Sequence, residues 1–400
     1  MSPLPTYDVI IVGAGPAGSL MGYELARLGL KALLIEKDAF PRYKACGGGL
    51  TRRTLDALPF DVSHVIEDYS YTAKMLYRNK ALYVKTHEKP IVGMVMRDVF
   101  DQYLVQKAEE TGVVVQDSTR FISVSGTSGN LLVKTSKGHF KTHLIAGTDG
   151  VNSRVSKSLG LRIRHDVMAA VEKEVKPERR HILERYRGSI VIDFGVIPGG
   201  YGWVFPKKDH LSTGVGASYT GFKGWRTHLE SYLNLKGINS SSTAHPDYPL
   251  RGRLIPINPR WDNIFSNACG LVAGDAAGCC DPLTGEGLYS AVRQSSIASK
   301  VIWDNLASGA GVARYSDLIR KEFMGDLRWA KRMAHVLYRY PAFSRRLLMK
   351  HGRAMGESQV AVIQSQLTYR DVFRKLAVSM LNPVRLLSLI AYRDNGDQRL

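Results

Sequence analysis

The sequence predicts an α/β protein that begins with a βαβ unit, continues through an antiparallel sheet and ends in helices. Residues 7–12 and 31–36 are short, β-branched or apolar runs next to glycine, as in buried strands, and helical spacing at 16–28 separates them. Strand-like runs alternate with Gly and Pro between 168 and 250, which favours a mostly antiparallel sheet. Beyond about residue 310 the pattern is almost wholly helical.

The same patterns predict further elements in order along the chain. One helix is expected at 100–110 and another from about Gly285 to Asn305. Gly, Ser and Asn turns separate the expected strands, which lie at 113–116, 120–124, 131–135, 140–146, 189–196, 202–205, 211–217 and 270–273.

Composition excludes several classes of protein. The 400 residues are 44% hydrophobic, so a mostly disordered chain and a single small binding module are both excluded, and two or three domains are expected. The net charge of +19 suggests an anionic partner. Residues 320–400 hold 16 Lys or Arg and 6 Asp or Glu, so the basic charge is concentrated near the C-terminus.

The cysteines and the N-terminus indicate the compartment. Four cysteines are too few for a disulfide scaffold, and their spacing predicts no metal site, so a reducing cytoplasm is expected. The N-terminal residues show no secretory signal, and no uninterrupted apolar run of about 18 residues predicts a membrane-spanning helix.

A glycine motif follows the first expected strand. Gly13, Gly15 and Gly18 form G-x-G-x-x-G, with Pro16 and Ala17 opening the helix, which is the context that dinucleotide binding requires. Phosphates would lie at the helix N-terminus, and Glu36, at the end of the next strand, would accept hydrogen bonds from ribose hydroxyls. The alternative is that these glycines only make a tight turn.

Three further motifs carry a resemblance to a known family. Residues 147–155 (GTDGVNSRV), 270–278 (GLVAGDAAG) and 281–288 (DPLTGEGL) resemble, in order and spacing, segments of the para-hydroxybenzoate hydroxylase superfamily of FAD-dependent oxidoreductases. Within it the chain resembles the geranylgeranyl reductase family. Besides the fingerprint residues and Glu36, the resemblance implies that FAD contacts Lys37, Lys44, Cys46, Gly47, Arg97, Asp149, Gly150, Gly274, Asp275, Pro282, Gly285 and Gly287.

Two segments match the geranylgeranyl reductases themselves. Residues 44–50 (KACGGGL) resemble their Cys-Gly segment beside the flavin, and 201–206 (YGWVFP) resembles their Tyr-x-Trp-x-Phe-Pro motif. In a strand, alternate aromatic side chains point to one face and make an apolar wall, although ordinary core packing produces the same alternation. Cys46 and Tyr201 are the expected proton-side catalytic residues, and the substrate contacts are expected at Tyr201, Trp203, Phe205 and Pro206.

The resemblance implies a discontinuous Rossmann-type FAD domain with an inserted substrate domain. The implied boundaries are 1–73, 92–165 and 254–310 for the FAD domain, 74–91 and 166–253 for the substrate domain, and 311–400 for a helical C-terminal region. The implied reaction is saturation of isolated C=C bonds in a polyprenyl chain by hydride transfer from reduced flavin. Because the chain has one dinucleotide fingerprint, the electron donor, NADPH or ferredoxin, is expected to visit.

The C-terminal region allows two interpretations. Residues 376–392 are apolar with few interruptions, and Arg370, Arg374 and Lys375 precede them, which fits peripheral contact with the inner face of the membrane. A helical layer packed on the FAD domain fits equally well. Cys279 and Cys280 are interpreted as local packing.

Other functions stay open at this point. A flavin-dependent monooxygenase of the same superfamily has the same flavin motifs, although the two reductase-like segments count against it. A flavin-dependent halogenase would need a paired-Trp motif that 201–206 does not match. Nucleic-acid binding, suggested by charge alone, lacks a supporting motif.

Overall fold

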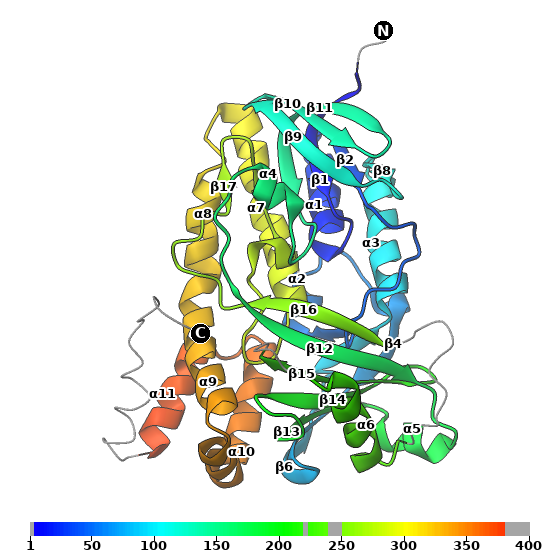
Figure 1. The fold of residues 1–400 in the computed structure, drawn as a ribbon, viewed down its shortest axis with the longest axis vertical. Helices are drawn as coiled ribbons and strands as arrows, with labels where there is room; N and C mark the ends of the chain where they lie inside the picture. The colour runs from blue at the N-terminus through cyan, green and yellow to red at the C-terminus, as the bar shows by residue number, and fades with distance from the viewer. Residues whose placement is uncertain (1–3, 219–222, 239–249, 381–400) are drawn as a thin grey trace.

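The computed structural model describes residues 4–218, 223–238 and 250–380. Two large sheets divide the molecule: one lies in the upper half of Figure 1 and the other in the lower half, with a column of helices along one side. This arrangement confirms the predicted fold class, with its parallel sheet, antiparallel sheet and helical C-terminal region.

The first sheet is parallel at its centre, and its central strands are buried because helices cover them. β1 (Thr6–Val12) pairs with β2 (Ala32–Ile35) on one side and with β11 (Gly138–Gly147) on the other. Strands that follow β1 in the chain therefore lie on both sides of it. In open α/β sheets, ligands bind at such a switch point, beyond the carboxyl ends of the strands. The remaining strands are β8 (Val114–Gln116), β9 (Phe121–Thr127), β10 (Asn130–Thr135), β17 (Ser266–Asn267) and β18 (Gly270–Val272).

Three helices pack beside this sheet, and α1 contacts the other two. α1 (Pro16–Arg27) starts within the glycine motif, directly after Gly15, and α3 (Arg97–Glu110) starts at Arg97. α7 (Leu288–Ser308) begins three residues later than the sequence suggested, because residues 281–287 form a turn in which Gly285 has a φ of +72°. The short α4 (Arg154–Ser158) follows β11.

The second sheet is antiparallel except where β13 (Ser189–Phe194) runs parallel to β5 (Thr72–Tyr77). β5 thus lies beside a strand more than a hundred residues later in the chain, and β6 (Lys80–Thr86) pairs with β5 at the edge of the sheet. The sequence patterns did not predict β5, β6, β12 (Asp166–Val175) or β16 (Arg251–Ile257) as strands, and β16 continues across the proposed boundary between residues 253 and 254. The other strands are β14 (Gly200–Pro206) and β15 (Leu211–Ser218), and α5 (Arg180–Tyr186) and α6 (Trp225–Leu235) pack on the sheet.

A small third sheet supports the segment that contains Cys46. β7 (Val92–Val95) pairs with β3 (Gly49–Thr51) and with β4 (Ile66–Ser70). α2 (Arg52–Ala57) continues directly from β3, and the short helix η1 (Ser63–Val65) precedes β4. The turn at 44–48 is thus anchored by a strand on its C-terminal side.

The C-terminal helices run down one side of the molecule and under the second sheet (Figure 1). They are α8 (Arg314–Ile319), η3 (Arg320–Met324), α9 (Gly325–Arg339), α10 (Pro341–Ile363) and α11 (Tyr369–Met380). Most of the segment 376–392, for which the sequence suggested membrane contact, lies outside the described residues. Within the described residues, no helix combines the length and apolarity that a membrane crossing requires.

Candidate functional site

The glycine motif leaves its central position open. A Cβ at Gly13, whose φ is +104°, would lie 2.5 Å from the Thr148 carbonyl oxygen, and a Cβ at Gly18 would lie 2.0 Å from the Gly13 oxygen. Both glycines are therefore needed for packing. A Cβ at Gly15 would lie 3.9 Å from the nearest atom outside the adjacent residues. The backbone at the start of α1 is therefore open to a pyrophosphate, whose negative charge the free N–H groups favour.

Glu36 is fixed beside this motif by a buried network of charges. Its Oε2 accepts the Ala14 N–H at 3.0 Å and lies 3.4 Å from a guanidinium nitrogen of Arg42. Arg42 also donates to Asp101 at 3.0 Å, and Asp101 accepts two hydrogen bonds from Arg97. Arg42 and Asp101 were not predicted from the sequence. They lie six and 65 residues after Glu36, so no local pattern indicates that the three side chains meet.

Arg97 lies on the side of this network nearest Cys46. Burial alone would lower the pKa of the Arg97 guanidinium, but the facing carboxylate of Asp101 raises it above its usual range. Arg97 also lies close enough to interact with the Cys46 side chain. One chain of contacts therefore links Glu36 to Cys46.

The second motif begins at the end of β11, and the third motif begins with β18. Both lie next to the glycine motif. The Thr148 hydroxyl donates to the carbonyl oxygens of Val12 and Gly13, and Asp149 caps α4 by accepting the Arg154 N–H at 2.7 Å. Gly150 has a φ of +85° with open space around its Cα. The Asp149 carboxylate is already engaged by hydrogen bonds at the start of α4, so the predicted contact of Asp149 with FAD stays a prediction.

In the third motif, Gly274 adopts a φ of +65° and donates its N–H to the Gln294 side chain at 2.9 Å. Asp275 lies 3.6 Å from the Lys44 ammonium and accepts a hydrogen bond from the Cys280 thiol at 3.4 Å. Lys44 and Asp275 thereby join two of the predicted cofactor segments across the site. Lys37 instead lies at the exposed surface beside Asp38.

The Cys46 turn rests on buried charged residues of the second sheet. Glu172 Oε1 accepts the Cys46 N–H at 2.6 Å and the Tyr43 hydroxyl at 2.7 Å. The buried Lys207 ammonium donates to the carbonyl oxygens of Gly47 and Val95. Burial, and then the charge of Glu174, raise the pKa of Glu172 to about 7.

The sequence analysis missed Glu172 and Lys207. The sequence does contain an indication of Glu172. Glu172 and Glu174 lie with Met168 on the inward face of β12, where polar residues are unexpected.

The turn at 281–287 is held from both sides. Asp281 accepts the Leu283 N–H at 2.8 Å within the turn, while the Tyr338 hydroxyl donates to the Leu283 oxygen at 2.5 Å. The Tyr201 hydroxyl donates to the Thr284 oxygen. Tyrosines from β14 and α9 therefore fix the carbonyl groups of the segment that was predicted to lie beside the flavin ring.

The aromatic side chains of β14 form a continuous wall. Ring centroids lie 6.3 Å apart for Tyr201 and Trp203 and 6.5 Å apart for Trp203 and Phe205. A Cβ at Gly47 would lie 2.8 Å from the Phe205 ring, and one at Gly285 would lie 3.4 Å from the Tyr201 hydroxyl oxygen. The wall therefore touches both segments that the sequence placed beside the flavin.

Strand alternation separates Pro206 from this wall. Val204 packs with the core under α6, on the opposite face of β14, and Pro206 shares its direction. The expected substrate contact of Pro206 therefore has no support in the strand geometry. Cys280 packs with Tyr201 and Trp203, and Cys279 packs in the core of the first sheet.

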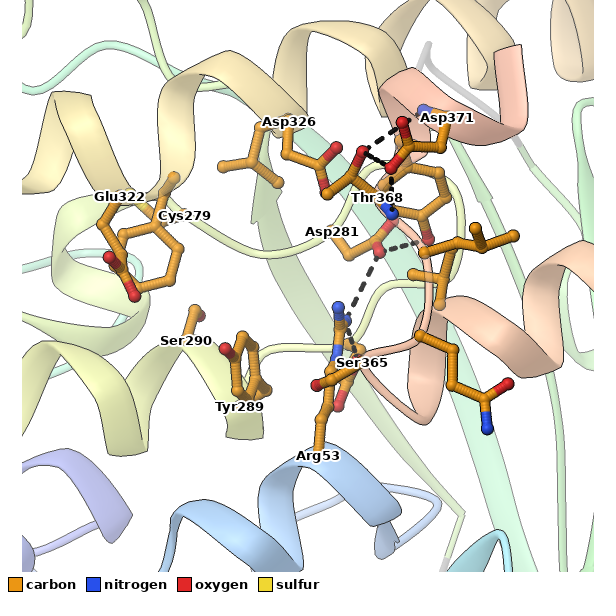
Figure 2. A pocket seen from close by; sticks show the side chains of 17 residues that line it. Arg53, Cys279, Asp281, Tyr289, Ser290, Glu322, Asp326, Ser365, Thr368 and Asp371 are labelled. Carbon is orange, nitrogen blue, oxygen red and sulfur yellow. Dashed lines mark hydrogen bonds and ion pairs between the residues drawn. The ribbon is translucent and has the colours of Figure 1, made fainter. Parts of the chain in front are cut away.

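A cavity of about 320 Å³ lies behind the turn at 281–287, between α7, α9 and the start of α11 (Figure 2). Arg53 and Asp281 point toward each other there, 3.8 Å apart, and Arg53 also pairs with Glu286. The Tyr369 hydroxyl donates to Asp281 at 2.5 Å. The predicted substrate and cofactor residues do not line this cavity, so we assign it a supporting position behind the site.

The residues present fit FAD. Gly15 offers open backbone at a helix N-terminus, Glu36 lies at the end of β2, and the Cys46 turn and the turn at 281–287 both contact the aromatic wall. Bound there, FAD would supply hydride chemistry, while the protein supplies orientation and exclusion of water.

Comparisons with known proteins agree with this geometry. Residues 6–180 match the FAD binding domain family. An uncharacterized protein of Methanosarcina barkeri is 32% identical, covering 77% of this chain and 78% of that protein. Digeranylgeranylglycerophospholipid reductase 3 of Methanosphaera stadtmanae is 29% identical, covering 74% and 76%.

A solved structure supports the same fold. A geranylgeranyl bacteriochlorophyll reductase-like protein of Thermoplasma acidophilum superposes with a TM-score of 0.78 at 20% identity, covering 94% of this chain and 99% of that one. The site geometry, the family match and the relatives agree with the resemblance seen in the sequence. The chain belongs to the geranylgeranyl reductase family and is an FAD-dependent oxidoreductase.

Proposed function

We propose that the protein saturates isolated C=C bonds of a polyprenyl chain of the geranylgeranyl type. The observation that carries this proposal is the contact of the aromatic wall with both Gly47 and Gly285. An apolar chain lying along this wall would sit beside the flavin ring. The names of relatives support an isoprenoid or prenylated lipid as the substrate class.

When bound and reduced, FAD would supply the hydride for one alkene carbon, and the protein would have to deliver a proton to the neighbouring carbon to complete the saturated bond. Cys46 and Tyr201 are the proposed proton donors. Burial, followed by the nearby charge of Asp281, raises the pKa of Tyr201, so its hydroxyl keeps its proton at neutral pH. Because this hydroxyl donates to Thr284, it must leave that acceptor to serve the substrate.

The electron donor and the location are also proposals. NADPH or ferredoxin is the proposed donor, and the net charge of +19 favours either anionic partner. A cytoplasmic location with peripheral contact at the inner face of the membrane fits a lipid substrate. The proposed division into FAD, substrate and C-terminal regions follows the boundaries expected from the sequence.

An anaerobic spectral experiment tests the proposed reaction. The purified protein is reduced with dithionite and mixed with geranylgeranyl diphosphate, and its flavin absorbance is followed. Return of the oxidised bands without oxygen supports electron transfer to the alkene. Bands that return only after oxygen is admitted would contradict reduction of this substrate and favour a monooxygenase.

Cys46→Ser and Tyr201→Phe test the proton donors in the same experiment. Loss of a positioned general acid lowers the rate of reoxidation by about 10²-fold or more, with unchanged flavin content. Cys269→Ser, at a half-buried position outside the site, is the matched control for Cys46. A Cys46→Ser protein that reoxidises at the wild-type rate would remove Cys46 from the mechanism.

A further inference from the structure

The corner where α9 turns into α10 exposes large apolar side chains. Only Tyr340 separates the two helices, and it is 53% exposed. Phe343 and Met349, on the first turns of α10, are 40% and 43% exposed. We call residues 339–353 the α9–α10 corner.

The same corner is strongly and uniformly basic. No Asp or Glu occurs between Asp326 and Glu357, a stretch that contains eight Lys or Arg. Arg345, Arg346 and Lys350 are exposed, and within the described part of the chain no carboxylate forms an ion pair with them. Exposed cations without partners raise the local positive potential.

One face of α10 is fixed against the second sheet, which leaves these side chains pointing outward. Its buried residues recur every four positions from Ser344 to Val360. A Cβ at Gly352 would lie 2.8 Å from the Leu82 Cβ, and one at Gly356 would lie 2.4 Å from the Tyr83 ring. This close packing on β6 holds the basic, apolar stripe on the surface.

The corner is also continuous with the proposed site. Tyr338, two residues before the exposed Tyr340, packs against the cluster containing Tyr201 and Trp203 and donates to the Leu283 oxygen. The carbonyl oxygen of Tyr338 lies near Gly199, in the turn between β13 and β14. One end of α9 therefore connects the surface to the aromatic wall.

We propose that the α9–α10 corner docks on an anionic lipid bilayer and presents membrane-held prenyl chains to the site, an inference that rests on the proposed function. Cations near an anionic lipid surface are attracted to its headgroups, and aromatic side chains favour the region between headgroups and acyl chains. A second copy of the chain would bring two equally basic surfaces together, which opposes a symmetric dimer at this face.

Co-sedimentation with vesicles tests the docking surface directly. The full-length, FAD-loaded protein is mixed with vesicles of phosphatidylcholine alone or with added phosphatidylglycerol, at low and at high salt. We expect salt-sensitive binding to the anionic vesicles, weakened at least tenfold by R345E/R346E and also weakened by F343S/M349S. K134E/K141E makes the same charge change on exposed residues of β10 and β11, at the opposite end of the molecule in Figure 1, and keeps wild-type binding.

Three results would overturn the docking surface: no binding by the wild-type protein, wild-type binding by R345E/R346E, or equal losses in R345E/R346E and K134E/K141E. The proposal would also be contradicted if the corner variants bound vesicles normally and lost only reduction by an acidic electron-donor protein. That result would make the corner a protein interface. Reduction of soluble geranylgeranyl diphosphate without vesicles is measured in parallel. R345E/R346E retains that activity, so failure of docking is distinguishable from failure of the proposed function.

Discussion

The two ends of the proposed cofactor site are built differently. At the pyrophosphate end, backbone geometry makes the site: Gly13 and Gly18 allow close packing, and Gly15 leaves the start of α1 open. At the flavin end, buried side chains make it: Glu172 and Lys207 hold the Cys46 turn, while Asp281 shapes the opposite turn. The first end depends on the shape of a short segment, and the second depends on charges brought together from distant segments.

This difference predicts different responses to substitution. A side chain added at the pyrophosphate end blocks the ligand or its turn, so cofactor binding is lost. A charge removed at the flavin end changes stability instead: stability is lost where an opposite charge is left buried without a partner, and gained where the removed charge is one of two like charges buried together, such as Glu172 and Glu174.

Arg53→Leu is expected to have the largest effect on stability. Arg53 pairs with Glu286 and lies near Asp281, and removing it leaves two buried carboxylates, which costs about 3–5 kcal/mol. Its neighbour Arg52 pairs with Asp56 at the exposed surface, so Arg52→Leu changes the free energy of unfolding by less than about 0.5 kcal/mol. Urea unfolding followed by circular dichroism measures both, and equal losses would contradict a supporting role specific to Arg53.

Gly13→Ala breaks the pyrophosphate end. Its Cβ would meet the Thr148 carbonyl at a φ of +104°, so we expect FAD affinity to fall by about a hundredfold, corresponding to roughly 3 kcal/mol. Gly325→Ala, at an open helical position, is the matched control and keeps wild-type flavin content. The ratio of flavin to protein absorbance after gel filtration measures the effect, and a normal ratio in Gly13→Ala would contradict the assignment.

Glu172→Gln tests the flavin end with a smaller change. Burial and Glu174 raise the pKa of Glu172 to about 7, whereas the unfolded chain titrates near its usual value. The folded protein therefore binds more protons between about pH 4.5 and 7, and the free energy of unfolding falls as pH rises through this range. The Gln side chain keeps an oxygen that accepts hydrogen bonds from Cys46 and Tyr43, but it does not titrate. The substitution therefore removes the fall in the free energy of unfolding and stabilises the protein at pH 8 by about 1–2 kcal/mol.

Denaturant unfolding from pH 4.5 to 8 measures this pH dependence. Glu178→Gln, at an exposed position, should leave the wild-type slope unchanged. A Glu172→Gln protein with the same slope as the wild type would show that Glu172 is not the titrating group.

The same contrast explains what the sequence could predict. The βαβ unit, the glycine fingerprint, Glu36 and the alternating wall at Tyr201, Trp203 and Phe205 follow from local spacing, and the structure contains each arrangement. Periodicity did not identify β12, because its inward face carries Glu172 and Glu174 where an apolar pattern was expected.

Contacts between distant segments were beyond local patterns. Arg42 meets Asp101 across 59 positions, and Tyr369 meets Asp281 across 88. Such pairs are set by the order of strands and helices in the fold. The flavin motifs predict a cofactor contact for the turn at 281–287, but they do not indicate which side chains hold this turn.

The identity of the product tests the central claim most directly. The protein, FAD and dithionite are incubated with geranylgeranyl diphosphate without oxygen, and the prenyl product is analysed by mass spectrometry, with boiled protein as the control. Our account predicts products that gain two hydrogens for each double bond reduced, with no added oxygen. Unchanged substrate without oxygen, together with an oxygenated product once air is admitted, would contradict it.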